Sequence, residues 1–118
     1  MKLKWGVIGS AGIARRRTIP EGITKADNAE LTAVYDINKE ANAEVAAEHG
    51  ARACASEAEL LGTEVDVVYI ATPAFEHFGQ IQRAAEAGKH VFCEKPLSLT
   101  VEECDQAQAI CATQGVQL

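Results

Sequence analysis

The sequence has no long apolar run, no excess of positive charge and no paired cysteine motif. Its 118 residues include 11 Lys and Arg against 17 Asp and Glu, which gives a formal net charge of −6. This balance argues against a nucleic-acid surface and against binding to anionic membranes. No segment is apolar enough to span a bilayer, and Lys2 and Lys4 interrupt the first apolar residues, so we predict no signal peptide and expect a cytoplasmic protein.

The four cysteines do not form a recognisable metal or redox pattern. Cys54, Cys93, Cys104 and Cys111 form no Cys-x-x-Cys pair, and no nearby histidine completes a zinc pattern. We therefore predict reduced thiols and no metal site. A hydrophobic content of 47% and a length of 118 residues predict one domain over residues 1–118 with an adequate core.

A cluster of small residues follows the first apolar run, and a helix-compatible pattern begins behind it. Aligned to the dinucleotide-binding pattern GxGxxG, the key positions fall on Gly9, Ala11 and Ala14. Alanine is acceptable at the third position, but at the second its methyl group narrows the space for phosphates, and Gly12 is expected to relax the turn instead. A glycine-rich loop that only caps a helix remains the alternative. The residues expected to hold a pyrophosphate are Gly9, Ser10, Ala11, Gly12 and Ile13.

Strand and helix patterns alternate along the whole chain. Strands are predicted over residues 3–9, 31–35, 51–54, 65–71 and 90–93, and residues 116–118 resemble the start of a sixth. Helices are predicted from residue 12, with an interruption or bend at Pro20, and over residues 38–49, 57–61, 75–87 and 100–115. The short connections predict a mostly parallel sheet with helices on both faces, a three-layer, doubly wound α/β fold.

Unusual residues follow the predicted strands, where such folds bind ligands. Asp36 follows the second strand and can accept hydrogen bonds from both ribose hydroxyls of an adenosine. Its charge would repel a 2′-phosphate, so we predict NAD and consider NADP the weaker candidate. The alternative is a solvent-facing turn aspartate.

Lys95 and His77 are the candidate catalytic residues. Lys95 lies between Glu94 and Pro96, and a lysine at the mouth of a nucleotide site can transfer protons if burial lowers its pKa. An exposed surface lysine is the alternative. His77 begins the helix after Thr72, and it could act in catalysis or serve as a packing or hydrogen-bonding histidine.

The chain resembles the glucose–fructose oxidoreductase / inositol dehydrogenase (Gfo/Idh/MocA) family in three places: the segment 71–73, His77 and the block 87–97 (AGKHVFCEKPL). The opening residues 6–9 and 13–14 and the acid at Asp36 also fit that family. The resemblance implies an N-terminal Rossmann domain followed by a C-terminal substrate domain that is absent from these 118 residues. It also implies hydride transfer between nicotinamide and a hydroxyl carbon of a sugar, polyol or related substrate.

By this resemblance, Lys95 lies at the nicotinamide and the substrate and assists proton transfer. The resemblance also implies cofactor contacts from Ala71, Thr72, Pro73 and Glu94. Two hypotheses remain. One is the NAD-binding domain of an oxidoreductase that acts on CH–OH groups. This domain would be inactive alone, and the protein could form a homo-oligomer. The other is a stand-alone nucleotide-binding regulatory or assembly module without turnover.

Overall fold

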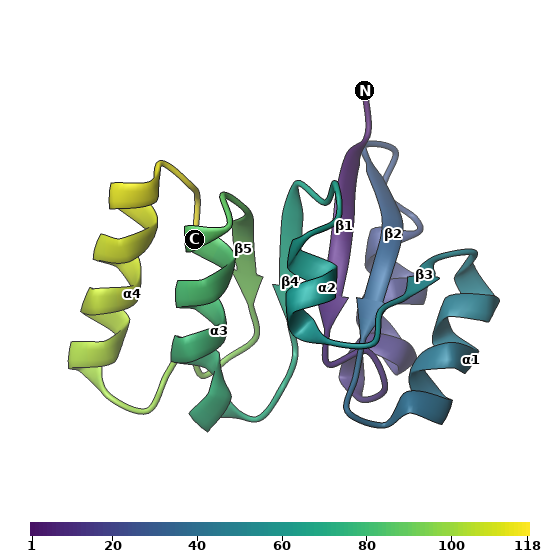
Figure 1. The fold of residues 1–118 in the computed structure, drawn as a ribbon, viewed down its shortest axis with the longest axis horizontal. Coiled ribbons are helices and arrows are strands. Elements are labelled where there is room, and N and C mark those ends of the chain that lie inside the picture. Colours follow the sequence, from purple (N-terminus) through teal and green to yellow (C-terminus); the bar gives the residue numbers. More distant parts are fainter.

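A computed structural model describes all of residues 1–118 and contains one sheet of five strands in the order β3-β2-β1-β4-β5 (Figure 1). Every pair of neighbouring strands is parallel. The predicted doubly wound α/β fold is therefore confirmed. The strands are β1 (Leu3–Ile8), β2 (Ala29–Tyr35), β3 (Arg52–Ala53), β4 (Val67–Ile70) and β5 (His90–Cys93). The helices are η1 (Ala14–Ile23), α1 (Lys39–His49), α2 (Glu57–Leu61), α3 (Ala74–Glu86) and α4 (Val101–Gln114).

Helices cover both faces of the sheet, and each face has its own apolar core. One core lies between the sheet and the helices η1 and α1, and the other lies between the sheet and α2, α3 and α4. Neighbouring strand residues alternate between the two cores. Val7 and Tyr69 belong to the first core, and Ile8 and Ile70 belong to the second. None of the helices has the length and apolar character that crossing a membrane requires.

The strand order reverses at β1, which pairs with β2 on one side and with β4 on the other. The chain runs from β1 outward to β3, then returns and continues through β4 to β5. The connections after β1 and after β4 therefore diverge to opposite faces of the sheet. A crevice at the carboxyl ends of the strands is expected at such a reversal point.

Side-chain caps begin three of the helices. The Asn38 side chain accepts a hydrogen bond from the Ala41 N–H at 3.0 Å at the start of α1. Ser56 accepts from the Glu59 N–H at 3.0 Å before α2. Thr100 accepts from the N–H of the residue three positions later before α4, at 3.1 Å. Glu59 and Glu103 reach back at the same helix starts, where their carboxylates accept from the N–H groups of Ala55 and Leu99, each one residue before the cap.

The first helix differs from the prediction because Pro20 does not interrupt it. Helix η1 runs from Ala14 to Ile23 as a π-helix, whose hydrogen bonds reach back five residues instead of four. At its end the Thr24 N–H donates to the Ile19 carbonyl at 3.0 Å. The wider helix accommodates the proline ring and carries the chain over one face of the sheet.

The first five strand patterns are confirmed, but the ends of the strands differ from the predicted ones. Strand β4 is shorter than residues 65–71, although Asp66 N–H and Ala71 N–H also donate to the main chain of β1, at 2.7 and 2.9 Å. Residues 116–118 form no strand of their own. One main-chain bond joins them to β5, from the Val91 N–H to the Gln117 carbonyl at 2.9 Å.

Candidate functional site

A cleft of about 260 Å³ opens at the carboxyl ends of β1, β2 and β4. It lies at the reversal of strand order, where the fold predicts a ligand site. Residues from the loop after β1, the end of β2, the loop after β4 and the starts of α2 and α3 line it. They are Gly9, Gly12, Tyr35, Asp36, Ile37, Glu57, Ala71, Thr72, Pro73, Glu76 and Gln80.

Gly9 permits the close approach of the loops after β1 and β4. Its φ is +91°, in the left-handed region that favours glycine. A Cβ at this position would lie 2.8 Å from both the carbonyl carbon and the carbonyl oxygen of Ala71. Gly12 has no positive φ, and a Cβ there would have no atom within 4 Å. The turn therefore depends on Gly9, whereas Gly12 does not relax it as the sequence had led us to expect.

Asp36 follows β2 directly and is fixed by two main-chain hydrogen bonds. Its Oδ2 accepts from the Ala11 N–H at 2.9 Å, and its Oδ1 accepts from the Asn38 N–H at 2.9 Å. The side chain is half-buried and forms part of the cleft wall. These bonds orient the carboxylate toward the glycine loop, so it is not a freely rotating turn residue.

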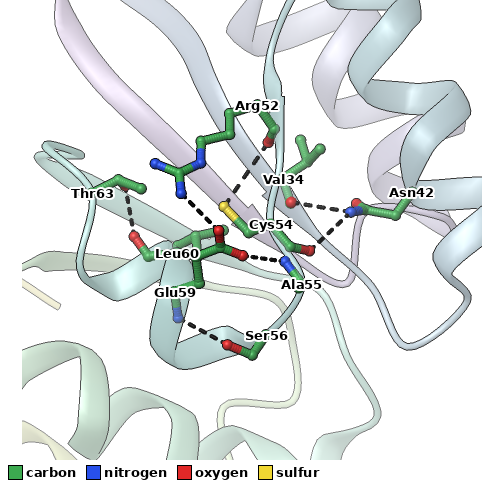
Figure 2. A network of polar contacts seen from close by, with 9 residues as sticks. All are labelled: Val34, Asn42, Arg52, Cys54, Ala55, Ser56, Glu59, Leu60 and Thr63. Carbon is green, nitrogen blue, oxygen red and sulfur yellow. Dashed lines mark hydrogen bonds and ion pairs between the residues drawn. The ribbon is translucent and has the colours of Figure 1, made fainter.

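Ser10 anchors the glycine loop and does not line the cleft. Its side chain is fully buried, and its Oγ donates to Asn42 Oδ1 at 2.7 Å. The Asn42 amide in turn donates to the carbonyl oxygens of Val34 at 3.2 Å and Cys54 at 3.4 Å (Figure 2). The loop after β1 is thereby tied to α1, β2 and the end of β3.

Helix α2 is held against β3 by the ion pair between Arg52 and Glu59, with 2.7 Å between nitrogen and oxygen (Figure 2). The hydrogen bond from Ala55 N–H and the bond from Arg52 lower the pKa of Glu59. Glu57, at the start of the same helix, lines the cleft and pairs with Arg83 of α3 at 2.6 Å. The pair with Arg83 joins the first turn of α2 to the last turn of α3.

Of the residues predicted to bind a cofactor, six line the cleft and five do not. Those in the wall are Gly9, Gly12, Asp36, Ala71, Thr72 and Pro73. Those outside it are Ser10, Ala11, Ile13, Glu94 and Lys95. Of the outside residues, Ala11 contributes its N–H to Asp36, and Glu94 and Lys95 belong to the segment after β5.

Five residues of the cleft wall are not among the predicted site residues. Tyr35 and Ile37 flank Asp36, and Ile37 is largely exposed beside the cleft. Glu57, Glu76 and Gln80 reach the cleft from α2 and α3. The first two lie in the first turns of their helices, which begin at the carboxyl edge of a parallel sheet. That placement is the signal that could have identified them.

The Glu94 carboxylate is hydrogen-bonded to a residue on the face of the sheet that packs against η1. Its Oε2 accepts a hydrogen bond from the Tyr69 hydroxyl at 2.7 Å, and the Thr18 hydroxyl lies 3.0 Å from the same Tyr69 oxygen. Its Oε1 accepts from the Lys95 N–H at 3.2 Å. The bonds from Tyr69 and from the Lys95 N–H lower the pKa of Glu94.

His77 is buried and joins two loops. Its Nδ1 lies 2.8 Å from the Pro96 carbonyl oxygen, and its Nε2 lies 2.8 Å from the Thr72 carbonyl oxygen. A neutral imidazole has one N–H, so only the doubly protonated ring donates both bonds. These contacts match the hydrogen-bonding alternative for His77, and a catalytic role would require one of them to open.

All four cysteines are free. Cys54 and Cys111 are buried in the apolar core under α2, α3 and α4. Burial, together with the charge of Glu94, raises the pKa of Cys93 to about 12. This thiol therefore remains protonated at neutral pH and is a poor nucleophile.

The sequence over residues 3–118 matches a family model described as an oxidoreductase family with an NAD-binding Rossmann fold. The chain belongs to the Gfo/Idh/MocA oxidoreductase family. Among curated members of this family, it is 37% identical over 117 residues to 1,5-anhydro-D-fructose reductase from Ensifer adhaerens, which covers 98% of this chain and 34% of the relative. It is 39% identical over 107 residues to inositol 2-dehydrogenase 3 from Saccharopolyspora erythraea, which covers 88% of this chain and 31% of the relative.

Solved structures agree with this assignment to the Gfo/Idh/MocA family. A 3-ketoreductase from Actinomadura kijaniata in complex with NADP superposes with a TM-score of 0.95 at 32% identity, covering 100% of this chain and 38% of that one. The WlbA dehydrogenase from Bordetella pertussis, in complex with NADH and UDP-GlcNAcA, superposes with a TM-score of 0.91 at 32% identity, covering 99% and 35%. The chain spans about a third of the length of these relatives and corresponds to their NAD-binding Rossmann domain.

Proposed function

We propose that this chain binds NAD in the cleft and forms the nucleotide-binding part of an oxidoreductase that acts on a CH–OH group. The observation that carries the proposal is Asp36, held beside the glycine loop at the end of β2. A carboxylate at this place suits the two hydroxyls of the adenosine ribose. Ala71, Thr72 and Pro73 then line the cofactor from the loop after β4.

The pyrophosphate lies over the loop at residues 9–13 in this proposal. The open space at Gly12 admits a ligand close to the main chain. Helix η1 begins directly behind the loop, and the free N–H groups of a helix start favour an anion. Ser10 contributes by fixing the loop and not by touching the ligand, because its hydroxyl is bonded to Asn42.

The charge of the cleft supports NAD over NADP. Asp36 and Glu76 line the cleft without an ion-pair partner, the third lining carboxylate, Glu57, is paired with Arg83, and no lysine or arginine lines the cleft. A 2′-phosphate on the adenosine ribose would add negative charge next to Asp36, which is unfavourable. Among the structural relatives both NADP and NADH complexes occur, so the local charge of this chain carries the argument.

Lys95 assists proton transfer in the proposed reaction. When a hydroxyl carbon is oxidised, its hydride passes to the nicotinamide and the hydroxyl proton must pass to a base. The neutral amine of a lysine can accept that proton and return it in the reverse direction. His77 acts differently in this proposal: it links the loop that carries Lys95 to the loop at Thr72.

The substrate is a sugar, a polyol or a related hydroxyl compound. Relatives named as an anhydrofructose reductase and an inositol dehydrogenase support this class. Those relatives are about three times as long as this chain, and we assign substrate binding to the part of an intact enzyme that lies outside the 118 residues.

Titration of NAD and NADP into the 118-residue chain by calorimetry tests the nucleotide proposal. We expect saturable NAD binding and weaker NADP binding. Equal or tighter binding of NADP contradicts the assignment to Asp36, and absence of binding by either nucleotide contradicts the proposed site.

A further inference from the structure

Both carboxylate oxygens of Glu94 are occupied by groups other than the ammonium of its neighbour. Oε2 accepts from the Tyr69 hydroxyl at 2.7 Å, and Oε1 accepts from the Lys95 main-chain N–H at 3.2 Å. No carboxylate in the structure lies within ion-pair distance of the Lys95 ammonium. Yet the two side chains are close enough for the charge of Lys95 to lower the pKa of Glu94. Glu94 is therefore close enough to Lys95 to feel its charge and does not pair with it.

The hydroxyl of Tyr69 is suited to hold this carboxylate permanently. The Tyr69 side chain is almost fully buried in the core under η1, and its ring packs edge-on against Phe92 with 6.0 Å between ring centroids. Burial and the bond to Glu94 raise the pKa of Tyr69 to about 12, so the hydroxyl remains a donor at any pH near neutrality.

Thr18 sets the direction of that donor. Its hydroxyl lies 3.0 Å from the Tyr69 oxygen, and since the Tyr69 proton is directed to Glu94, Thr18 donates to the tyrosine oxygen. The resulting chain runs from η1 through β4 to the segment after β5. It joins the helix behind the glycine loop to the segment that carries Lys95.

We propose that Tyr69, oriented by Thr18, is a positioning residue that keeps the carboxylate of Glu94 away from the ammonium of Lys95. The proposal rests on the role of Lys95 in the proposed function. A carboxylate paired with the ammonium would favour its charged form and reduce the amine available to accept a proton. Holding Glu94 on the tyrosine leaves Lys95 free of that pair. The other titratable groups that act on Glu94 or Tyr69 are His77 and Cys93, and Tyr69→Phe leaves both in place.

The titration of Lys95 itself is the direct measurement. The side-chain carbon resonances of Lys95 are followed by NMR as pH rises, in the 118-residue chain and in its Tyr69→Phe variant. We expect the variant to titrate at higher pH by about 0.2–0.7 units, the size of one exposed ion pair. Adding Glu94→Gln to Tyr69→Phe should remove the increase, because the amide cannot form the pair. The control is Tyr35→Phe, which removes the only other tyrosine hydroxyl and should leave Lys95 unchanged.

An unchanged Lys95 titration in a folded Tyr69→Phe chain overturns the proposal. An increase that persists after Glu94→Gln also overturns it, because the pair would then not be its cause. If Tyr69→Phe does not fold, Thr18→Val replaces it. That variant should shift Lys95 in the same direction by a smaller amount, and no shift in the folded variant contradicts the proposal.

NAD affinity, measured on the same variants, separates this inference from the proposed function. If the Tyr69→Phe chain shows the Lys95 shift and the chain does not bind NAD, the positioning role of Tyr69 is supported and the proposed nucleotide site is contradicted. If the chain binds NAD and the Lys95 titration does not shift, the proposed nucleotide site is supported and the positioning role of Tyr69 is contradicted.

Discussion

The carboxylate of Asp36 accepts a hydrogen bond from the main-chain N–H of Ala11 at 2.9 Å, so the end of β2 is bonded to the glycine loop. The two parts of the cleft proposed to hold ribose and pyrophosphate are thereby assembled before a ligand arrives. A ribose hydroxyl would meet an oriented acceptor, and less ordering is needed on binding.

Replacing Asp36 should change the choice of nucleotide. We expect Asp36→Ala to weaken NAD binding about 5–30-fold, the equivalent of about 1–2 kcal/mol for lost hydrogen bonds to a charged group. NADP binding should weaken less or improve, because the repulsion disappears. Calorimetric titrations with both nucleotides check this, and an unchanged ratio of the two affinities contradicts it.

Gly9 and Gly12 should respond differently to the same substitution. Gly9→Ala places a Cβ against the Ala71 main chain at a positive φ, and we expect it to destabilise the fold by about 1–3 kcal/mol or more. Gly12→Ala meets no protein atom, so it should retain stability but weaken NAD binding by occupying the open space. Urea unfolding and NAD titration distinguish the two. If Gly12→Ala binds NAD with unaltered affinity, the pyrophosphate does not bind over this loop.

Lys95→Ala should reduce turnover far more than nucleotide binding. In an intact oxidoreductase containing this chain, we expect kcat and kcat/KM to fall together by about 10²–10⁴-fold, because general acid–base assistance acts in the transition state. Lys95→Arg should not restore the rate, since guanidinium remains protonated. Steady-state kinetics with separately measured NAD affinity test this, and near-normal turnover would mean that the exposed Lys95 has no catalytic role.

The bond between Tyr69 and Glu94 should make stability depend on pH in the acid range. Because the folded-state pKa of Glu94 is lowered below its ordinary value of 4.5, its contribution is complete above that value and is lost as pH falls through the folded pKa. We therefore expect wild type to exceed Glu94→Gln in free energy of unfolding at pH 6–7, with the difference disappearing in acid. Urea unfolding across this range measures it. A difference that is independent of pH would mean that the charge of Glu94 contributes nothing.

The fold could be predicted from sequence because its signals are local. Apolar runs ending in small or turn residues predicted each strand, and the helix patterns over residues 57–61 and 100–115 located α2 and α4. The order of alternation then allowed few arrangements other than a parallel sheet. The π-helical form of η1 was not predicted, since a proline in a helical pattern normally signals a break and the wider geometry depends on packing against the sheet.

The candidate site was predictable where it follows strand ends and unpredictable where it depends on packing between helices. Gly9, Asp36 and Ala71 follow strands directly and line the cleft as expected. Glu57 reaches the cleft from α2, which buries Leu60 in the core and pairs Glu59 with Arg52 of β3, and no sequence spacing indicates these contacts. The buried bond between Ser10 and Asn42 joins residues 32 positions apart and was also invisible in the sequence.

Trp5 lies in the first half of β1, half-buried beside Phe92, while the cleft begins where that strand ends at Gly9. Four residues of extended chain separate them by about 13 Å. The protein contains one tryptophan, so its emission comes from a single place in the sheet, away from the proposed ribose and pyrophosphate contacts. Fluorescence at this site can therefore report unfolding of the sheet while oxidised nucleotide is titrated at the other end.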